Sequence, residues 1–329
     1  TAALPGDVVA IAKLSATRTG DTLCDPTHPV TVAEIAWPEP VYAAAVVGQS
    51  RDEEEKLSTT LTRLVEADPT LHLARHPETH EWILSGQGDM HLDVVREILR
   101  QRFGVQAELA IPRVPLRETI RRHARAEGRH KKQTGGHGQF GHVFLQLDPN
   151  PDGEFEFVDK IFGGAVPRQF IPAVEKGVRE TMAEGVLAGY TVTNVRVTLD
   201  DGSYHPVDSS EMAFKIAASL AFKQAFVDAD PTILEPVDRV DLLVPEEYMG
   251  DIMGDVTRRR GRILGMESDG GLQSIHAEMP EWELGRYAID LRSLTHGSGR
   301  FHREFARYEQ MPDYIVQQVI EAAKVSKEA

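Results

Sequence analysis

The glycine-rich segment Gly136-His137-Gly138-Gln139-Phe140-Gly141-His142-Val143 has the spacing of a phosphate-binding loop. It fits G-x-G-x-x-G-x-V, the pattern of the kinase glycine-rich loop, and it contains the dinucleotide fingerprint. The fingerprint requires a strand before the loop and a helix after it, whereas a basic polar run precedes this segment and a strand is expected to follow it. A kinase would also need H-R-D and D-F-G; the chain offers His302-Arg303-Glu304 and no D-F-G. We therefore interpret the segment as the tip of a flexible hairpin.

This tip has the chemistry of an RNA contact. Its glycines let the backbone approach a ligand closely, His137 and Gln139 offer hydrogen-bond donors, and Phe140 offers a ring that can stack or pack. The stretch from Arg113 to His142 carries eight basic and two acidic residues, a net charge of +6, in a chain of net charge −15. Such an asymmetry suits a protein that engages nucleic acid at one place. The alternative is a solvated loop with a chance run of charge.

A second polar loop runs from Asp201 to Asp208 and contains serine, histidine and aspartate. A catalytic triad is assembled by the fold from separate segments, so three neighbours on one loop do not predict catalysis, and we expect no catalytic residue. Tyr204, His205 and Pro206 are instead expected to form a polar tip that touches nucleic acid. Asp208 either joins that tip or caps the next helix, because Asp208-Ser209-Ser210-Glu211 has the form of a capping box.

A third basic feature is Arg258-Arg259-Arg260-Gly261-Arg262, at the end of an expected helix. Cations there favour the helix dipole, but the cluster exceeds what capping needs and also suits RNA phosphates. Thirteen histidines raise the question of a metal. No Cys-x-x-Cys or His-Glu-x-x-His is present, so we expect no metal site.

Composition restricts the class of protein. The 329 residues contain 36 Lys and Arg against 51 Asp and Glu, which argues against a protein that coats DNA. Cys24 is the single cysteine, so no disulfide framework exists and a cytoplasmic location is expected. No run of about 18 apolar residues predicts a membrane span, and from the first residues of this sequence we expect no secretory signal. The first residue is not methionine, so we expect a fragment or a processed product.

Hydrophobic periodicity predicts an α+β, multidomain chain. Residues 1–36 resemble β-hairpins at the end of a β-domain. Residues 37–112 read βαββαβ, with helices over 51–67 and 89–103, the second of them capped by Asp89. Residues 113–235 form a different α+β unit, residues 236–311 repeat the βαββαβ pattern, and a terminal helix covers 312–329. The two repeats indicate ferredoxin-like sandwiches.

Many short motifs of this chain resemble the C-terminal part of bacterial elongation factor G, the translocation GTPase. The matching segments are Thr19-Gly20-Asp21-Thr22-Leu23-Cys24, Trp37-Pro38-Glu39-Pro40-Val41, Asp68-Pro69-Thr70-Leu71, Ser85-Gly86-Gln87-Gly88-Asp89-Met90-His91-Leu92, Arg117-Glu118-Thr119-Ile120, Gly135 to His142, Leu187-Ala188-Gly189-Tyr190, Gly202-Ser203-Tyr204-His205, Val207-Asp208-Ser209-Ser210-Glu211 and Arg258-Arg259-Arg260-Gly261.

The resemblance implies a domain order. Residues 1–36 would end β-barrel domain II, 37–112 would be ferredoxin-like domain III, and 113–235 domain IV, similar to domain 2 of ribosomal protein S5. Residues 236–311 would be ferredoxin-like domain V, and the helix 312–329 would pack back on domain IV. No Gly-x-x-x-x-Gly-Lys-Ser/Thr is present, so GTP and Mg²⁺ are expected in a GTPase domain outside this chain, which itself would hold no cofactor.

The resemblance also implies partners. The domain IV tips would enter the decoding region of the small ribosomal subunit and contact tRNA and mRNA, and domain V would approach large-subunit RNA, in a cytoplasmic monomer without membrane contact. The residues expected to bind RNA are Gly136, His137, Gly138, Gln139, Phe140, Tyr204, His205, Pro206, Asp208, Arg258, Arg259 and Arg260. His137, Phe140 and Pro206 depart from the usual family residues, which leaves a second reading: a paralogue that binds ribosomes but acts in recycling or stress.

Overall fold

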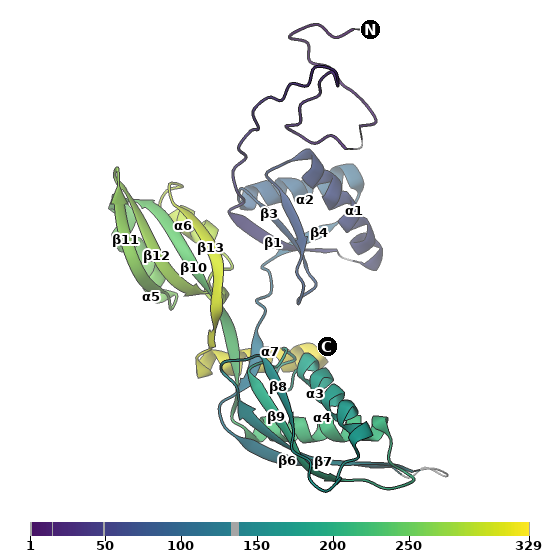
Figure 1. Ribbon diagram of the computed structural model, residues 1–329. Coiled ribbons are helices and arrows are strands. Elements are labelled where there is room, and N and C mark those ends of the chain that lie inside the picture. Colours follow the sequence, from purple (N-terminus) through teal and green to yellow (C-terminus); the bar gives the residue numbers. More distant parts are fainter. Residues whose placement is uncertain (1, 15, 49, 133–137, 329) are drawn as a thin grey trace. The chain divides into compact units, whose positions relative to one another are not determined.

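The computed structural model describes residues 2–14, 16–48, 50–132 and 138–328 (Figure 1). Its contacts divide the chain into two compact units, each described by itself. The first unit comprises Thr1–Arg113, Val240–Met279 and Glu283–Arg303, and the second Val114–Arg239, Pro280–Trp282 and Glu304–Ala329. Within the described part of the chain, every helix is too short or too polar to cross a membrane.

The β-hairpins expected in residues 1–36 do not form in the part of this segment that the structure describes. Among the described residues 2–14 and 16–40, none belongs to a strand, and apolar side chains such as Val8 and Ile11 are exposed. Strands need hydrogen-bonded neighbours and a buried face, and this segment has neither within the described chain. Its assignment to the end of a β-barrel remains a prediction.

The first βαββαβ pattern forms as predicted. Its elements are β1 (Tyr42–Gly48), α1 (Arg51–Ala67), β2 (His72–Arg75), β3 (Trp82–Gly86), α2 (Asp89–Phe103) and β4 (Ala107–Ala110). The strand order β2-β3-β1-β4 is that of a ferredoxin-like sandwich. Leu57 and Leu61 of α1 and Leu92 and Leu99 of α2 enter the core. Asp89 is the first helical residue and not the cap, which is Gly88, with no side-chain cap bond.

The second βαββαβ pattern has the same topology. It consists of β10 (Pro231–Pro245), α5 (Met249–Arg258), β11 (Arg262–Asp269), β12 (Leu272–Pro280), α6 (Tyr287–Leu294) and β13 (Arg300–Gln310). The strand order β11-β12-β10-β13 again matches the ferredoxin-like arrangement. Strand β10 begins at Pro231, ahead of the predicted boundary, because its first residues pair with β5 (Arg117–Ile120) in the second unit.

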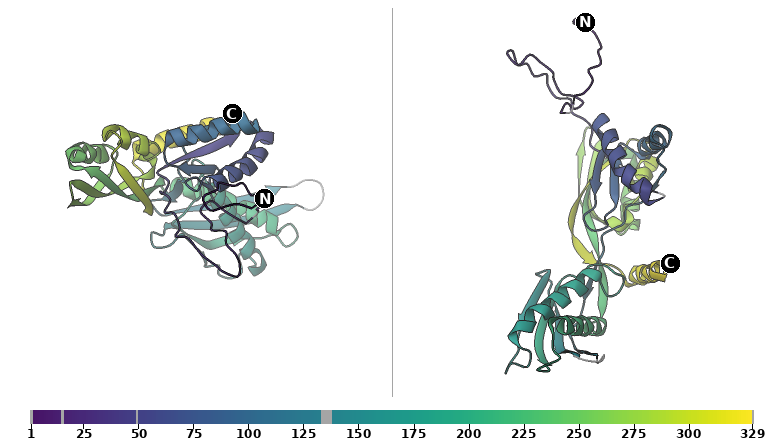
Figure 2. Two further views of the ribbon diagram at one scale, coloured as in Figure 1. Left: turned by 90° about the horizontal axis from the view of Figure 1, so that it is seen from above. Right: turned by 90° about the vertical axis from the view of Figure 1, so that its right-hand side faces the viewer.

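The second unit has a different topology. Strands β6 (Ala124–Lys132), β7 (Gln139–Pro149), β8 (Phe155–Asp159) and β9 (Val195–Ser203) form a sheet of order β6-β7-β9-β8. The only parallel pair in this sheet, as far as it is described, is β8 with β9, and α3 (Ile171–Glu184) connects them. Helices α3 and α4 (Glu211–Asp228) cover one face of the sheet (Figures 1 and 2). The α+β multidomain class is therefore confirmed.

The basic stretch, which the charge pattern presents as a loop, is largely strand. Ala124, Ala126 and Gly128 point inward along β6, while Arg125 and Arg129 point to solvent. The period of two is the signature of a half-buried strand. The side chains of Arg125, Arg129 and Lys131 therefore lie on one face of the hairpin, whose register pairs Lys132 of β6 with Gln139 of β7.

Glycines allow α4 to pack directly on this hairpin. A Cβ on Gly128 would overlap the carbonyl oxygen of Ala217 and lie 2.5 Å from the amide nitrogen of Ala221. A Cβ on Gly141 of β7 would overlap the carbonyl group of Ala213. These neighbours are helix backbone, which cannot rotate away as a side chain can. The hairpin and the helix are thus in backbone contact.

A buried carboxylate joins two loops of the second unit. Glu118 of β5 is fully buried, and its two oxygens accept hydrogen bonds from five consecutive backbone N–H groups, those of Val186 to Tyr190, at 2.6 to 3.1 Å. Charged acceptors form the stronger class of hydrogen bonds, so Glu118 fixes the turn after α3 against β5.

The terminal helix α7 (Asp313–Glu328) packs within the second unit. Ile315, Val316 and Val319 form a core cluster with Leu116 and Ile233.

Candidate nucleic-acid interface

The two predicted tip loops meet through Asp208. Its Oδ1 accepts a hydrogen bond from the backbone N–H of Gly138 at 3.0 Å, and its carbonyl oxygen accepts one from the N–H of Phe140 at 2.8 Å. A Cβ at Gly138 would lie 3.0 Å from the Asp208 carboxyl group, so glycine suits this contact. The structure therefore brings the start of β7 and the loop after β9 together.

The loop after β9 is ordered by its own side chains. Ser209 Oγ accepts from the backbone N–H of His205 at 2.9 Å and donates to the carbonyl of Phe140 at 3.0 Å. His205 Nδ1 accepts from the N–H of Asp208 at 3.2 Å, which leaves Nε2 as the donor of the ring. The His205 side chain is 52% exposed, so that donor edge is accessible.

Helix α4 begins later than a cap at Asp208 would require. Ser210 is the N-cap, and its Oγ accepts from the N–H of Ala213 at 3.2 Å. The capping interpretation of Asp208 is therefore wrong, because its carboxylate is used to hold Gly138.

Each predicted tip residue can now be placed. Gln139 is exposed, and its Oε1 lies 3.0 Å from His130 Nε2 across the hairpin. The Phe140 ring is 6.4 Å from the His205 ring and 5.8 Å from the Arg129 guanidinium. Tyr204 and Pro206 are exposed on the second loop. Gly136 and His137 lie outside the described residues.

The positive charges near the tip differ from those at the base of the sheet. Arg121, Arg122 and Arg125 are ion-paired with aspartates, as in the contact of 2.7 Å between Arg125 and Asp200 that raises the pKa of this arginine. Among the described residues, Arg129, Lys131 and Lys132 at the tip end of β6 form no ion pair. Arg129, Lys131 and Lys132, which form no ion pair within the described chain, are thus the cations next to the two loops.

Ser203 does contact a histidine, although not the one beside it in sequence. His142 Nδ1 lies 2.7 Å from Ser203 Oγ, and His142 Nε2 lies 3.0 Å from Glu127 Oε1. The second contact lacks hydrogen-bond geometry, since Nε2 is buried without a partner among the described residues. In a catalytic triad the third residue orients the base through a hydrogen bond. Glu127 makes no such bond to His142, so Ser203, His142 and Glu127 do not form a catalytic triad.

Comparison with known proteins identifies the family. Residues 37–111 match the model of elongation factor G domain III, residues 112–230 that of elongation factor G domain IV, and residues 232–319 that of the elongation factor G C-terminus. The chain belongs to the elongation factor G family. A crystal structure of a protein from Thermus thermophilus is 43% identical, with a TM-score of 0.77, over 88% of this chain and 44% of that one. The chain thus spans less than half the length of that similar protein.

The part that matches domain IV of elongation factor G contains both tip loops, and the part that matches the C-terminus contains the arginine cluster. Arg259 is largely buried and contacts both Asp255 and Asp290 at 2.8 Å; burial opposes its charge, yet these hydrogen bonds raise its pKa. Arg260 contacts Glu283 at 3.0 Å. Arg258 remains 76% exposed beside Asp255. Arg258 is therefore the member of the predicted trio best placed to reach a phosphate, and RNA contact by the cluster stays a prediction.

The same cluster covers a buried tyrosine, whose behaviour we can predict. Tyr287 is fully buried beneath the Arg259 guanidinium, its hydroxyl has no hydrogen-bond partner among the described residues, and burial raises its pKa. Tyr287→Phe is expected to leave the free energy of unfolding unchanged or to raise it by about 1 kcal/mol, because an unsatisfied polar group is removed. Tyr308→Phe is the matched control, since the Tyr308 hydroxyl donates to the carbonyl of Pro115 at 2.9 Å. Urea unfolding should show a loss for the control alone; an equal loss for both would contradict the prediction.

Proposed function

We propose that this chain is the C-terminal, ribosome-binding part of a translational GTPase of the elongation factor G type. In this proposal the two tip loops enter the decoding region of the small ribosomal subunit and contact tRNA and mRNA during translocation. GTP and Mg²⁺ would act in a separate domain of the intact protein, and no chemical step is assigned to residues of this chain. The protein would act as a cytoplasmic monomer, with domain V close to large-subunit RNA.

One observation supports the proposal. Asp208 joins the two polar loops by hydrogen bonds to the backbone of Gly138 and Phe140. The joined loops lie beside the cations of β6 that lack ion pairs within the described chain. Nucleic-acid affinity comes largely from phosphate contacts by cations, while exposed polar and aromatic groups read unpaired or splayed bases. The exposed Gln139 amide and His205 ring supply such groups, and Arg129 and Lys131 supply the charge. The arginines at the base of the sheet are neutralised, which favours RNA contact at the tip.

The test is single-turnover translocation on pre-translocation ribosomes, with the intact parent protein and GTP. Gln139→Ala and His205→Ala are each expected to slow translocation roughly tenfold, the effect of losing about 1.4 kcal/mol of transition-state stabilisation. Gln224→Ala is the matched control, because Gln224 is exposed on α4 and bonds only to Asp228 on the same helix among the residues described. Unchanged rates for both tip variants, with unchanged melting temperatures, would refute the role of the tip.

The same assay addresses the paralogue reading. Phe140 and Pro206 depart from the usual family residues within the described tip, and these departures are the reason for the alternative, a paralogue that binds ribosomes but acts in recycling or stress. Fast translocation by the wild-type parent would exclude that reading. Ribosome binding without movement would support it, and reversion of Pro206 would then be the first change to make.

A further inference from the structure

Three loops of the second unit leave its four-stranded sheet from one end. β7 begins beside the end of β9, because His142 pairs with Ser203, so the β6–β7 hairpin and the loop after β9 lie at this end. β8 runs parallel to β9, with Asp159 opposite Leu199, so the segment after β8 leaves the sheet in the same direction. The proposed function uses the first two loops and leaves the third loop, residues 160–168, without a role.

The third loop is anchored on both sides of its turn. On one side the N–H of Lys160 donates to the carbonyl oxygen of Leu199 at 2.9 Å, and Ile161 packs against the core. On the other side Val166 is buried so close to β9 that a Cβ on Gly202 would lie 2.5 Å from Val166 Cγ2. The base of the third loop is therefore fixed beside the end of β9.

Between these anchors the chain turns sharply and exposes a phenylalanine. Gly163 and Gly164 have φ angles of 66° and 74°, and two successive positive φ angles are typical of a type I′ turn. The N–H of Ala165 closes the turn by donating to the carbonyl oxygen of Phe162 at 3.5 Å. Phe162, just before the turn, is 94% exposed. The ring therefore projects from a loop whose base is held in place.

Two cations flank this phenylalanine in sequence. Lys160 and Arg168 are exposed and form no ion pair within the described chain. Asp159 precedes them, and its Oδ1 accepts the N–H of Ile161 at 2.9 Å. One exposed apolar side chain needs no explanation by itself. An exposed ring between two cations, however, has the composition of a surface that stacks bases and contacts phosphates.

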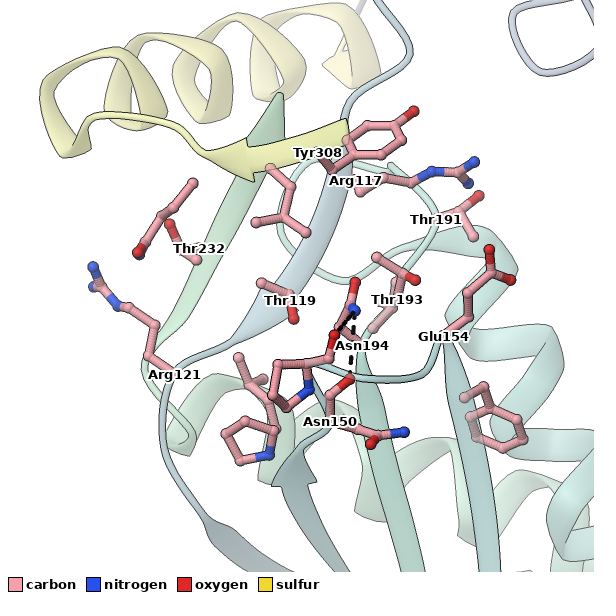
Figure 3. A pocket seen from close by; sticks show the side chains of 17 residues that line it. Arg117, Thr119, Arg121, Asn150, Glu154, Thr191, Thr193, Asn194, Thr232 and Tyr308 are labelled. Carbon is pink, nitrogen blue, oxygen red and sulfur yellow. Dashed lines mark hydrogen bonds between the residues drawn. The ribbon is translucent and has the colours of Figure 1, made fainter. Parts of the chain in front are cut away.

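The opposite end of the sheet offers less free charge. There Asn194, just before β9, donates through its side chain to the carbonyl oxygen of Asn150, just after β7, at 3.4 Å (Figure 3). Arg121 lines the cavity drawn in Figure 3, and it contacts Asp230 at 2.9 Å and Asp313 at 3.1 Å. A phosphate at that end would have to displace these contacts, whereas the third loop presents its cations unpaired.

The position of the third loop distinguishes between the RNAs of the proposed complex. β8 is an outer strand and β9 separates it from β7, so with strands about 4.8 Å apart the third loop begins roughly 10 Å to the side of the first tip loop. β8 also ends opposite Leu199, four residues before the end of β9. When the two tip loops reach tRNA and mRNA, the third loop lies beside them and further back, where the surrounding RNA is that of the ribosome.

We propose that the third loop binds the RNA of the small ribosomal subunit. The Phe162 ring stacks on an unpaired base, and Lys160 and Arg168 contact the adjoining phosphates. Every base has a face on which a ring can stack, so the third loop adds affinity and does not read a sequence. This inference rests on the proposed function, because it takes the ribosome as the source of the RNA.

Photo-crosslinking tests the partner directly. The intact parent protein, with p-azidophenylalanine in place of Phe162, is bound to pre-translocation ribosomes with a non-hydrolysable GTP analogue and irradiated. The expected product is a cross-link to small-subunit ribosomal RNA, which primer extension should map to an unpaired base. Cross-links only to tRNA, mRNA or a ribosomal protein would overturn the proposal, and so would the absence of any cross-link from ribosome-bound protein.

The affinity of the parent protein for ribosomes gives a second readout. Phe162→Ala should weaken binding about tenfold, the loss of one stacked base, while Phe162→Tyr keeps the ring and should bind as the wild type does. Both variants should melt at the wild-type temperature, because the ring is exposed. Lys160→Gln combined with Arg168→Gln should reduce the slope of log affinity against log salt by about 1.4, which is about 0.7 for each phosphate contact.

Phe305→Ala is the matched control. Phe305 is also exposed, but its ring lies 5.4 Å from the ring of Tyr308, which lines the cavity in Figure 3 at the other end of the sheet. This variant should bind ribosomes as tightly as the wild type. Equal affinity of Phe162→Ala and the wild type would overturn the third-loop contact alone and leave the proposed function standing. A wild-type parent that does not bind ribosomes would overturn both.

Discussion

Gly128→Ala is expected to destabilise the second unit by about 3 kcal/mol or more, the upper range for an overpacked core. The added Cβ would overlap the backbone of α4 at Ala217 and Ala221, and neither atom group can move without moving the helix. The expected result is faster amide exchange throughout β6 and α4. Hydrogen exchange measured by peptide is the suitable method, because it reports the local stability of one unit in a chain that contains two.

Gly254→Ala is the control for the same chemical change. Gly254 lies inside α5, and no described atom comes within 4 Å of the place its Cβ would occupy. Alanine favours a helix over glycine by about 1 kcal/mol, so this variant should slow exchange in α5. If Gly128→Ala left amide exchange in β6 and α4 unchanged, the close contact between the hairpin and the helix would be disproved.

Glu118→Gln should produce the second large effect, a loss of about 3 kcal/mol in the stability of the turn after α3. The carboxylate accepts five backbone N–H bonds, whereas the amide offers one acceptor oxygen and brings its own N–H groups close to those donors. The amides of residues 186–190 should therefore exchange roughly a hundredfold faster. Exchange measured by NMR on these amides gives the answer directly.

Glu156→Gln removes the same charge from a partly exposed site. Its carboxylate contacts Arg196 at 2.6 Å on the open side of the sheet, where solvent screens the pair. Exchange of residues 186–190 should be the same as in the wild type. A similar acceleration in both variants would mean that net charge, and not the buried carboxylate, controls the turn.

The sequence predicted some elements closely because one signal dominated each of them. Helix α1 spans Arg51–Ala67, as predicted, since leucines at helical spacing mark its buried face. Strand β6 was not predicted, because its inward residues are the small Ala124, Ala126 and Gly128 and the charged residues between them are typical of a solvated loop. The alternation was nevertheless visible in the sequence.

The remaining site features depend on contacts that a linear pattern cannot show. Arg259 and Arg260 look like free cations in sequence, yet Asp290 and Glu283 lie more than twenty residues away along the chain and neutralise them. In the sequence Glu118 looks like an ordinary charged residue of a strand. Its role depends on the turn of residues 186–190, whose N–H groups bind its carboxylate only in the folded chain. The hydrogen bond from the Gly138 N–H to the Asp208 carboxylate joins two segments that lie seventy residues apart in the sequence.

The distribution of free charge on the hairpin also has a kinetic consequence. The chain as a whole repels polyanions at its net charge of −15, while Arg129, Lys131 and Lys132 remain unpaired within the described structure at one end of β6. A polyanion that approaches by diffusion is therefore turned toward that end before any contact forms. Ionic strength should then act mainly on the rate of association, and residence time should be governed by the polar loops.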